Sequence, residues 1–239
     1  MISVCMATYN GEAFVREQLL SILSQLSAED EVLIADDGST DATLEIIQSL
    51  KDPRIQIIPP SPRRLGPVYN LERVLSRAQG KWIFLADQDD VWLPNKVSKV
   101  LAEFEKTAAD CILHDAFFYR KNQDGSWECG NRIFEIRPPH HGIFSNVKKN
   151  SYTGCCMAFR RNLLDKALPF PQSLPMHDQW IGLCAEKTKK ARFLREPLIK
   201  YRIHLHNATD LANGKRASLG QKILWRWSLV RILLSRLGR

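Results

Sequence analysis

Two hydrophobic periods alternate along the first half of the chain, and this alternation limits the available folds more than any other feature. Apolar residues recur at helical spacing in several segments, as in Val15, Leu19 and Ile22. Short apolar runs that are typical of buried strands occupy residues 2–7, 31–35, 54–58 and 81–86. The pattern predicts an α/β fold in which helices flank a mostly parallel central sheet.

Three of the predicted strands end in polar clusters. These clusters occupy residues 8–11, 36–39 and 87–90. In parallel sheets the carboxyl ends of the strands meet at one edge, and ligands bind beyond that edge. The sequence therefore predicts a single binding site built from the three clusters.

The third cluster carries three carboxylates within four residues, Asp87, Asp89 and Asp90. Such carboxylates repel one another unless a cation lies between them, and Mg²⁺ or Mn²⁺ prefers oxygen ligands. Side chains alternate along an extended segment, so Asp87 and Asp89 should share one side, with Asp90 directed toward ribose or the second shell of the metal. The alternative is an acidic turn that caps the helix after Pro94.

The first two clusters suit a nucleotide. A carboxylate at the end of the second strand can accept a hydrogen bond from the imide N–H of a base, and Gly38 permits a tight turn there. An ordinary strand-to-helix turn is the alternative. The candidate nucleotide-binding residues in these clusters are Thr8, Tyr9, Asn10, Glu12, Asp36 and Asp37.

Further candidates come from the second half of the chain. Asp178 follows a proline-rich loop and is the best-placed general base for a hydroxyl acceptor, although an N-cap role is the alternative. Arg202 is a candidate for phosphate and His204 for a nitrogen ligand to the metal. A satisfied structural histidine is the alternative at position 204.

With these residues in place, the sequence resembles a family-2 glycosyltransferase of the GT-A fold over roughly residues 1–210. Residues 177–207 contribute His177-Asp178 and Tyr201-Arg-x-His204-x-x-Asn207. The last of these patterns, together with the Asp-Gln-Asp-Asp-Val-Trp form of residues 87–92, resembles bacterial rhamnosyltransferase-like members. The other matching positions are residues 8–11, 36–39 and 85–92, Gly66 with Asn70, and Gly154.

The resemblance implies a role for individual residues. It implies Asp37 at the base, Asp87 with Asp89 or Asp90 at ribose and metal, Asp178 as general base and His204 as metal ligand. Asn70 and Gln88 join the donor-binding residues. One departure is His177, because many relatives carry Glu before the catalytic Asp, and this makes contacts with the acceptor uncertain.

The function implied is inverting transfer of a sugar, rhamnose among the candidates, during surface polysaccharide synthesis. The donor would be a nucleoside-diphosphate sugar of the dTDP or UDP type, the cofactor Mn²⁺ or Mg²⁺, and the acceptor a glycan or lipid-linked glycan. Residues 1–110 would bind the donor, residues 111–212 would bind the acceptor, and residues 213–239 would form a basic helical tail.

Charge is concentrated in that tail. Nearly all of the net charge of +8 comes from seven Lys and Arg residues within 215–239, where there is no acid. A nearly neutral body argues against a nucleic-acid partner. Trp and Arg in the tail suit an anionic membrane surface, whereas packing on the body or in a homodimer is the alternative.

The remaining features favour a cytoplasmic protein, peripheral on the inner face of the membrane. The N-terminal residues lack the basic and apolar regions of a leader, and no apolar stretch is long enough to span a bilayer. Six cysteines without paired spacing indicate reduced, mostly buried thiols. A sugar-phosphate nucleotidyltransferase or a non-catalytic sugar-nucleotide-binding protein stays as an alternative, although residues 8–12 lack the basic phosphate loop of the former.

Overall fold

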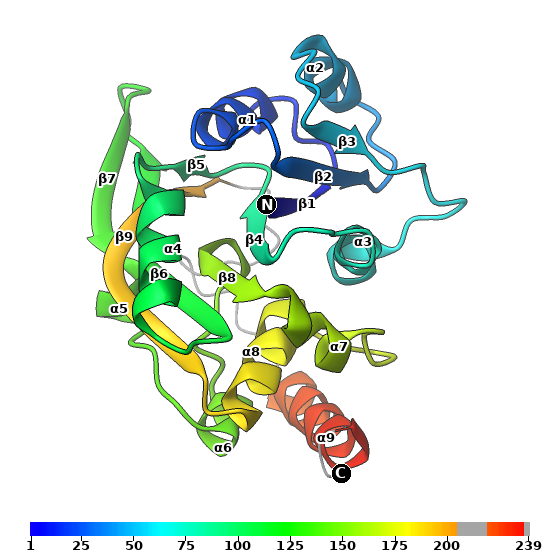
Figure 1. The fold of residues 1–239 in the computed structure, drawn as a ribbon, viewed down its shortest axis with the longest axis vertical. Helices are drawn as coiled ribbons and strands as arrows, with labels where there is room; N and C mark the ends of the chain where they lie inside the picture. The colour runs from blue at the N-terminus through cyan, green and yellow to red at the C-terminus, as the bar shows by residue number, and fades with distance from the viewer. Residues whose placement is uncertain (205–218, 237–239) are drawn as a thin grey trace.

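A computed structural model describes residues 1–204 and 219–236. Within them one curled sheet of nine strands forms the centre of the molecule, and helices cover it (Figure 1). The strand order is β3-β2-β1-β4-β8-β6-β9-β5, with β7 paired to β6. The predicted α/β, GT-A-like architecture is confirmed.

The N-terminal half of the sheet is parallel, as the alternating pattern predicts. Strands β1, β2 and β4 are almost entirely buried up to their carboxyl ends, because helices lie over both faces. The strands of this half are β1 (Ile2–Thr8), β2 (Glu31–Asp36), β3 (Ile55–Ile57) and β4 (Trp82–Asp87). Its helices are α1 (Val15–Leu23), α2 (Thr43–Ser49) and α3 (Gly66–Leu75).

The second half mixes directions: β8 pairs antiparallel with β4 and β6, whereas β9 runs parallel to β6. Strand β9 runs through Pro197, and its register against β6 shifts near Asp115, which lies opposite Pro197. The exposed β7 and the two-residue β5 lack any apolar period and were not predicted. The bounds are β5 (Val91–Trp92), β6 (Cys111–Lys121), β7 (Trp127–Arg132), β8 (Met157–Arg160) and β9 (Ala191–Ile203).

Helices of the second half surround these strands. Among α4 to α8 the longest are α4 and α8, and α8 begins at the predicted His177-Asp178 pair. The α-helices are α4 (Lys96–Lys106), α5 (Ile133–Ile136), α6 (Ile143–Lys148), α7 (Leu164–Ala167) and α8 (His177–Lys187). The 3-10 turns are η1 (Gly154–Cys156) and η2 (Arg161–Leu163).

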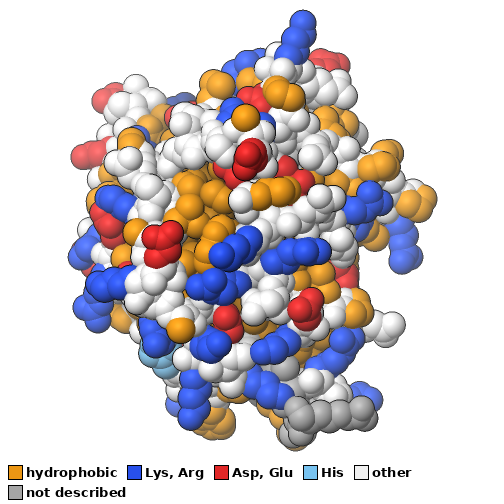
Figure 2. All heavy atoms as spheres, in the orientation of Figure 1, with side chains coloured by type: hydrophobic (Ala, Val, Ile, Leu, Met, Phe, Trp, Pro, Cys, Tyr) orange, Lys and Arg blue, Asp and Glu red, His pale blue; other side chains and the backbone are white. Residues whose placement is uncertain are grey.

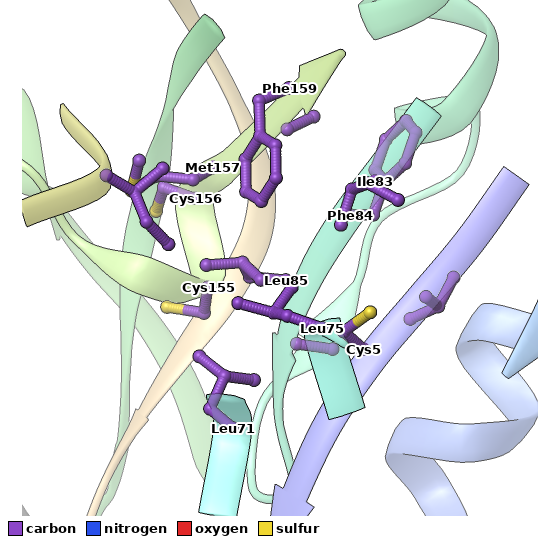
Figure 3. Close-up of a cluster of buried hydrophobic side chains, with 14 of the residues drawn as sticks. Cys5, Leu71, Leu75, Ile83, Phe84, Leu85, Cys155, Cys156, Met157 and Phe159 are labelled. Atoms are coloured by element: carbon purple, nitrogen blue, oxygen red, sulfur yellow. The ribbon is translucent and has the colours of Figure 1, made fainter. Parts of the chain in front are cut away.

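The hydrophobic core continues across the two halves of the sheet. Figure 3 shows side chains of β4 and β8 meeting those of α3 and η1, with Cys155 beside Leu85 and Leu71. All six cysteines are free thiols, and only Cys129 on β7 is exposed. The cysteines are therefore free thiols, as the sequence predicts, and the five buried ones act as small apolar groups of the core.

The C-terminal basic helix that the sequence predicts is present as α9 (Leu219–Arg236). Residues 205–218 and 237–239, which include Asn207, lie outside the described residues. One side of α9 packs on the body, with Leu229 and Ile232 buried, and the helix lies beside α6 (Figure 1). Neither α9 nor any other helix among the described residues combines the length and apolar character that crossing a bilayer requires.

Candidate active site

A cavity of about 440 Å³ opens at the carboxyl ends of β1, β2 and β4, within the size range of small-molecule sites. It is lined by both halves of the chain, so the three polar clusters and the α8 terminus converge as predicted. The sequence-predicted residues on its wall are Thr8, Tyr9, Asp37, Asn70, Asp87, Gln88, Asp89 and Asp178.

A reciprocal hydrogen-bond pair joins the ends of β1 and β4. The backbone N–H of Tyr9 donates to Gln88 Oε1 at 3.0 Å, and Gln88 Nε2 donates to the Tyr9 carbonyl at 2.9 Å. A Cβ at Gly11 would overlap the Gln88 amide, so a larger residue here would have to displace Gln88 from this pair. The pair fixes Tyr9 on the wall, where the Arg64 guanidinium lies 3.7 Å from its ring centroid.

Asp37 is held by the loop before α3. Its two oxygens accept hydrogen bonds from the backbone N–H groups of Leu65 and Gly66 at 2.8 and 2.9 Å. Asn70 is fully buried beneath and donates to the Ala35 carbonyl at 2.6 Å. Each carboxylate oxygen of Asp37 retains a further lone pair for a ligand.

Three predicted nucleotide residues lie outside the cavity wall and brace the segment that follows β2. Asn10 accepts from the Thr40 N–H, and Glu12 accepts from the Ala42 N–H. Asp36 accepts from the Thr8 hydroxyl at 2.9 Å and from the backbone of Gly38. These contacts shape the turn after β2, and a role at the nucleotide stays a prediction for the three.

The carboxylates after β4 divide as the alternation suggests. Asp87 and Asp89 line the cavity, whereas Asp90 is only 1% exposed and accepts the Arg202 backbone N–H at 3.0 Å. From below, an oxygen of Asp90 approaches Asp87 and the Cys155 sulfur, all within 4.8 Å. Desolvation at the cavity floor, with the charges of Asp89 and Asp178, raises the pKa of Asp87 to about 7.

The second cavity carboxylate meets the late histidine. Asp89 Oδ2 lies 2.8 Å from His204 Nε2, and both side chains are partly exposed. The contact is a hydrogen bond or ion pair between the carboxylate and the imidazole. Both groups are of types that can act as metal ligands, so their role at a divalent cation stays a prediction.

Asp90 and Cys155 fit such an ion less well. Burial, and then the charges of Asp89 and Asp87, raise the pKa of Asp90 well above its ordinary value. The pKa of the Cys155 thiol is also raised, through its hydrogen bond to Cys156 and through burial, and a protonated thiol is a poor ligand. One oxygen of Asp90, Oδ2, is buried without a hydrogen-bond partner among the described residues.

Lys96 was missed by sequence reasoning, although it begins α4 directly below the carboxylates. The residue is fully buried, its Nζ donates to the Cys155 carbonyl at 3.1 Å and lies 3.9 Å from the Trp92 ring centroid. Burial lowers its pKa to about 8, against the opposing charges of Cys156, Cys155, Asp90 and Asp87. Its cation offsets part of the repulsion among the acids. A lysine in a helical stripe gives no sequence signal of burial.

Arg202 does not line the cavity. Its guanidinium donates to Glu17 Oε2 at 2.6 Å and to the Asp89 carbonyl at 2.7 Å, among the rings of Phe14 and Trp127. These contacts indicate that Arg202 positions the Asp89–Asp90 turn. Its contact with phosphate stays a prediction.

Asp178 lies on the opposite wall, in the first turn of α8, where the helix dipole favours a negative charge. It is 8% exposed, and its Oδ1 accepts from the Gln179 N–H at 2.6 Å and from Asn150 Nδ2 at 3.4 Å. Arg137 also lines the cavity, and the sequence did not reveal it. Burial lowers the pKa of Arg137, and the negative charge of Asp178 partly opposes that decrease.

Comparison with known proteins agrees with this architecture. The chain is 28% identical over 217 residues to a dTDP-rhamnosyl transferase, RfbG, of Shigella flexneri, covering 84% of this chain and 72% of that protein. TarS of S. aureus (residues 1–349, with UDP-GlcNAc) superposes with a TM-score of 0.69 and 19% identity, over 98% of this chain and 72% of TarS.

A mannosyltransferase, PcManGT of Pyrobaculum calidifontis, solved with GDP-Man and Mn²⁺, superposes with a TM-score of 0.61 and 17% identity. The superposition covers 97% of this chain and 64% of that one, so the chain spans only part of the length of such relatives. The family model described as "Glycosyl transferase family 2" matches residues 3–168, which include the ends of β1, β2 and β4. The chain belongs to glycosyl transferase family 2.

Proposed function

We propose that the chain transfers a sugar from a nucleoside-diphosphate sugar to a hydroxyl of a glycan or lipid-linked glycan, with inversion at the sugar carbon. One observation carries the proposal: Asp178 and the Asp87–Asp89 carboxylates line one cavity, near enough that the Asp178 charge raises the pKa of Asp87. A donor between the two walls would lie beside both the cation site and the general base.

The nucleoside would occupy the end of the cavity formed by Tyr9, Asp37 and Asn70. The free lone pairs of Asp37 can accept the imide N–H of uracil or thymine, which suits a UDP or dTDP donor. The Tyr9 ring and Arg64 provide a flat wall for the base. The relatives that carry dTDP-rhamnosyl and UDP-GlcNAc in their names support the same donor types.

Asp89 and His204 would hold Mn²⁺ or Mg²⁺, with Asp87 at the metal or at the ribose hydroxyls. Asp87 and Asp89 line the cavity and His204 contacts Asp89, which favours them over Asp90, whose carboxylate is enclosed. A bound cation supplies charge that stabilises the leaving nucleoside diphosphate. Arg202 and Lys96 keep the turn in place from below.

Asp178 acts as the general base. It takes the proton of the acceptor hydroxyl while that oxygen attacks the anomeric carbon and the bond to the diphosphate breaks on the opposite face. A single displacement gives one inversion, and one base is sufficient for it. Asn150 and the first turn of α8 orient the carboxylate toward the cavity.

The most specific form of the proposal is a rhamnosyltransferase of surface polysaccharide synthesis, supported by the similarity to the Shigella flexneri protein. The reaction is placed in the cytoplasm, because all six cysteines are free and such thiols persist in reducing compartments.

The test is a donor-by-acceptor screen. The purified chain is incubated with Mn²⁺, with dTDP-rhamnose, UDP-glucose, UDP-GlcNAc or GDP-mannose, and with a synthetic diphospholipid-linked GlcNAc acceptor. Release of nucleoside diphosphate that depends on acceptor, and an inverted linkage in the product by NMR, are expected for one donor. Retention at the anomeric carbon, or release of inorganic diphosphate from a nucleoside triphosphate and sugar phosphate, would contradict the proposal.

A further inference from the structure

Large apolar side chains are exposed on α6 and α9. The described residues include eight large hydrophobic side chains that are exposed, and five of them, Trp225 (41% exposed) included, lie on these two helices. We give the name α6–α9 face to the surface that comprises Phe144 (84% exposed), Leu224 (68%), Trp227 (70%) and Val230 (38%).

The face is held in a fixed orientation. Leu229 and Ile232 on the opposite side of α9 are buried against the body, and Arg226 Nη2 donates to the Lys148 carbonyl of α6 at 2.8 Å. On α6, Phe144 and Lys148 are four residues apart and share one side of the helix.

Leu224, Trp227 and Val230 follow one another at three-residue spacing and project outward, away from the packed side of α9. Trp225 is four residues before Leu229 and lies toward the packed side.

Cations surround these apolar groups. Lys148 and Lys149 at the end of α6 and Arg226, Arg231 and Arg236 on α9 are exposed, whereas residues 136–164 and 215–239 contain no acid. Glu186, which lies close to α6, is buried and accepts hydrogen bonds from Gly142 and Tyr152. At the lower end of Figure 2, near α6, basic and hydrophobic side chains stand together.

This chemistry favours a lipid surface over a second copy of the chain. Trp side chains with Arg at the margin suit the boundary between headgroups and acyl chains, and the cations attract anionic lipid. A two-fold dimer would place the same cations opposite one another, which is unfavourable. No helix among the described residues could cross the bilayer, so attachment would be peripheral.

The face adjoins the acceptor side of the cavity. Lys148 and Asn150 are two residues apart, so their Cα atoms are at most roughly 7 Å apart. Asn150 Nδ2 lies 3.4 Å from Asp178 Oδ1, the proposed general base. A surface at Lys148 is therefore close to the place where an acceptor hydroxyl must be deprotonated.

We propose that the α6–α9 face docks on an anionic phospholipid bilayer and so presents the cavity to an acceptor anchored in that bilayer. The docking itself rests on the face alone, and the identity of the acceptor rests on the proposed function. The acceptor class is thereby narrowed to a glycan on a lipid carrier.

The experiment measures sedimentation of the 239-residue chain with vesicles. Phosphatidylcholine vesicles with 30 mol% (about a third) phosphatidylglycerol are compared with pure phosphatidylcholine. The double variant Phe144→Ser/Trp227→Ser is compared with Leu20→Ser, a control on α1 that changes a side chain 52% exposed outside the face. Circular dichroism and thermal unfolding check that each variant folds.

The wild type and the Leu20→Ser control should bind anionic vesicles, with binding weakened by salt, and the double variant should bind at least about tenfold more weakly. Equal binding by the double variant would overturn the docking proposal, as would no binding by the wild type. A concentration-dependent dimer that the double variant abolishes in sedimentation velocity would replace it with self-association.

Calorimetry of UDP or dTDP with Mn²⁺ separates the two proposals. The double variant should bind nucleotide as the wild type does, because its substitutions lie outside the cavity. Vesicle binding without any nucleotide binding would leave the docking intact and refute the proposed function. Nucleotide binding without vesicle binding would refute the docking and leave the proposed function intact.

Discussion

Asp89 and His204 are 115 residues apart in the chain, yet Asp89 Oδ2 lies 2.8 Å from His204 Nε2. The contact joins the turn after β4 to the end of β9, so it exists only when both halves of the sheet are assembled. Beneath it, Arg202 donates to the Asp89 carbonyl and to Glu17, which keeps the turn in register with α1. The first prediction concerns the cation that this pair would hold.

Substitution of Asp89 by Asn or of His204 by Ala should weaken Mn²⁺-dependent binding of UDP or dTDP by at least about tenfold, because each would remove a proposed ligand of the cation. Calorimetry with Mn²⁺ and with EDTA measures the effect. Asp90→Asn is the matched control, since it keeps an oxygen for the Arg202 N–H outside the cavity. Equal nucleotide binding by the wild type in EDTA would discard the metal assignment.

Asp178→Asn should lower turnover by at least about 10²-fold, the usual effect of losing a general base. The amide keeps the shape and can still accept from the Gln179 N–H, so nucleotide affinity should stay near that of the wild type. Steady-state transfer assays with calorimetry of the same preparation make the comparison. Turnover close to the wild-type value would remove Asp178 from the role of base.

Gly11→Ala should destabilise the fold by about 1–3 kcal/mol through overpacking and should weaken nucleotide binding. The added Cβ would displace Gln88 and break its pair with the Tyr9 backbone. The double variant Gly11→Ala/Gln88→Ala removes the clash. Its loss of unfolding free energy should therefore be smaller than the sum of the losses in the two single variants. Denaturant unfolding of the four proteins measures this coupling, and strict additivity would contradict the steric explanation.

His114, which is fully buried on β6, should contribute a loss of stability on acidification. Burial, and then the Lys96 charge, lower the pKa of His114 well below its ordinary value. Below about pH 6.5 the unfolded chain therefore binds a proton that the folded chain does not, and stability is lost at up to about 1.4 kcal/mol per pH unit.

His114→Phe should remove that contribution, so the slope of the unfolding free energy against pH should be less positive than in the wild type between about pH 6.5 and pH 5. His177, whose pKa burial also lowers, adds to the wild-type slope, whereas Asp87 and Asp90, whose pKa values burial raises, oppose it. Urea unfolding at a series of pH values gives both slopes. Parallel slopes for the variant and the wild type would show that His114 does not carry the effect.

The order of the N-terminal strands and helices could be predicted because burial alternates locally along the chain. Residues 2–7, 31–35 and 81–86 are apolar in succession since both faces of β1, β2 and β4 are covered. The polar residues that follow them had to gather at one edge, because parallel strands end together. This is why Asp37, Asp87 and Asp89 could be assigned to one site.

The tertiary structure alone decided the contacts between distant segments. Nothing local in the sequence shows that Lys96 and Cys155 lie below the carboxylates, that Asn10 and Glu12 brace a turn outside the cavity wall, or that Asn150 reaches Asp178. Sequence period records how much of a side chain is buried and not which partner buries it. The partners come from segments distant in the chain, which strand pairs such as β1 with β2 and β4 with β8 bring together.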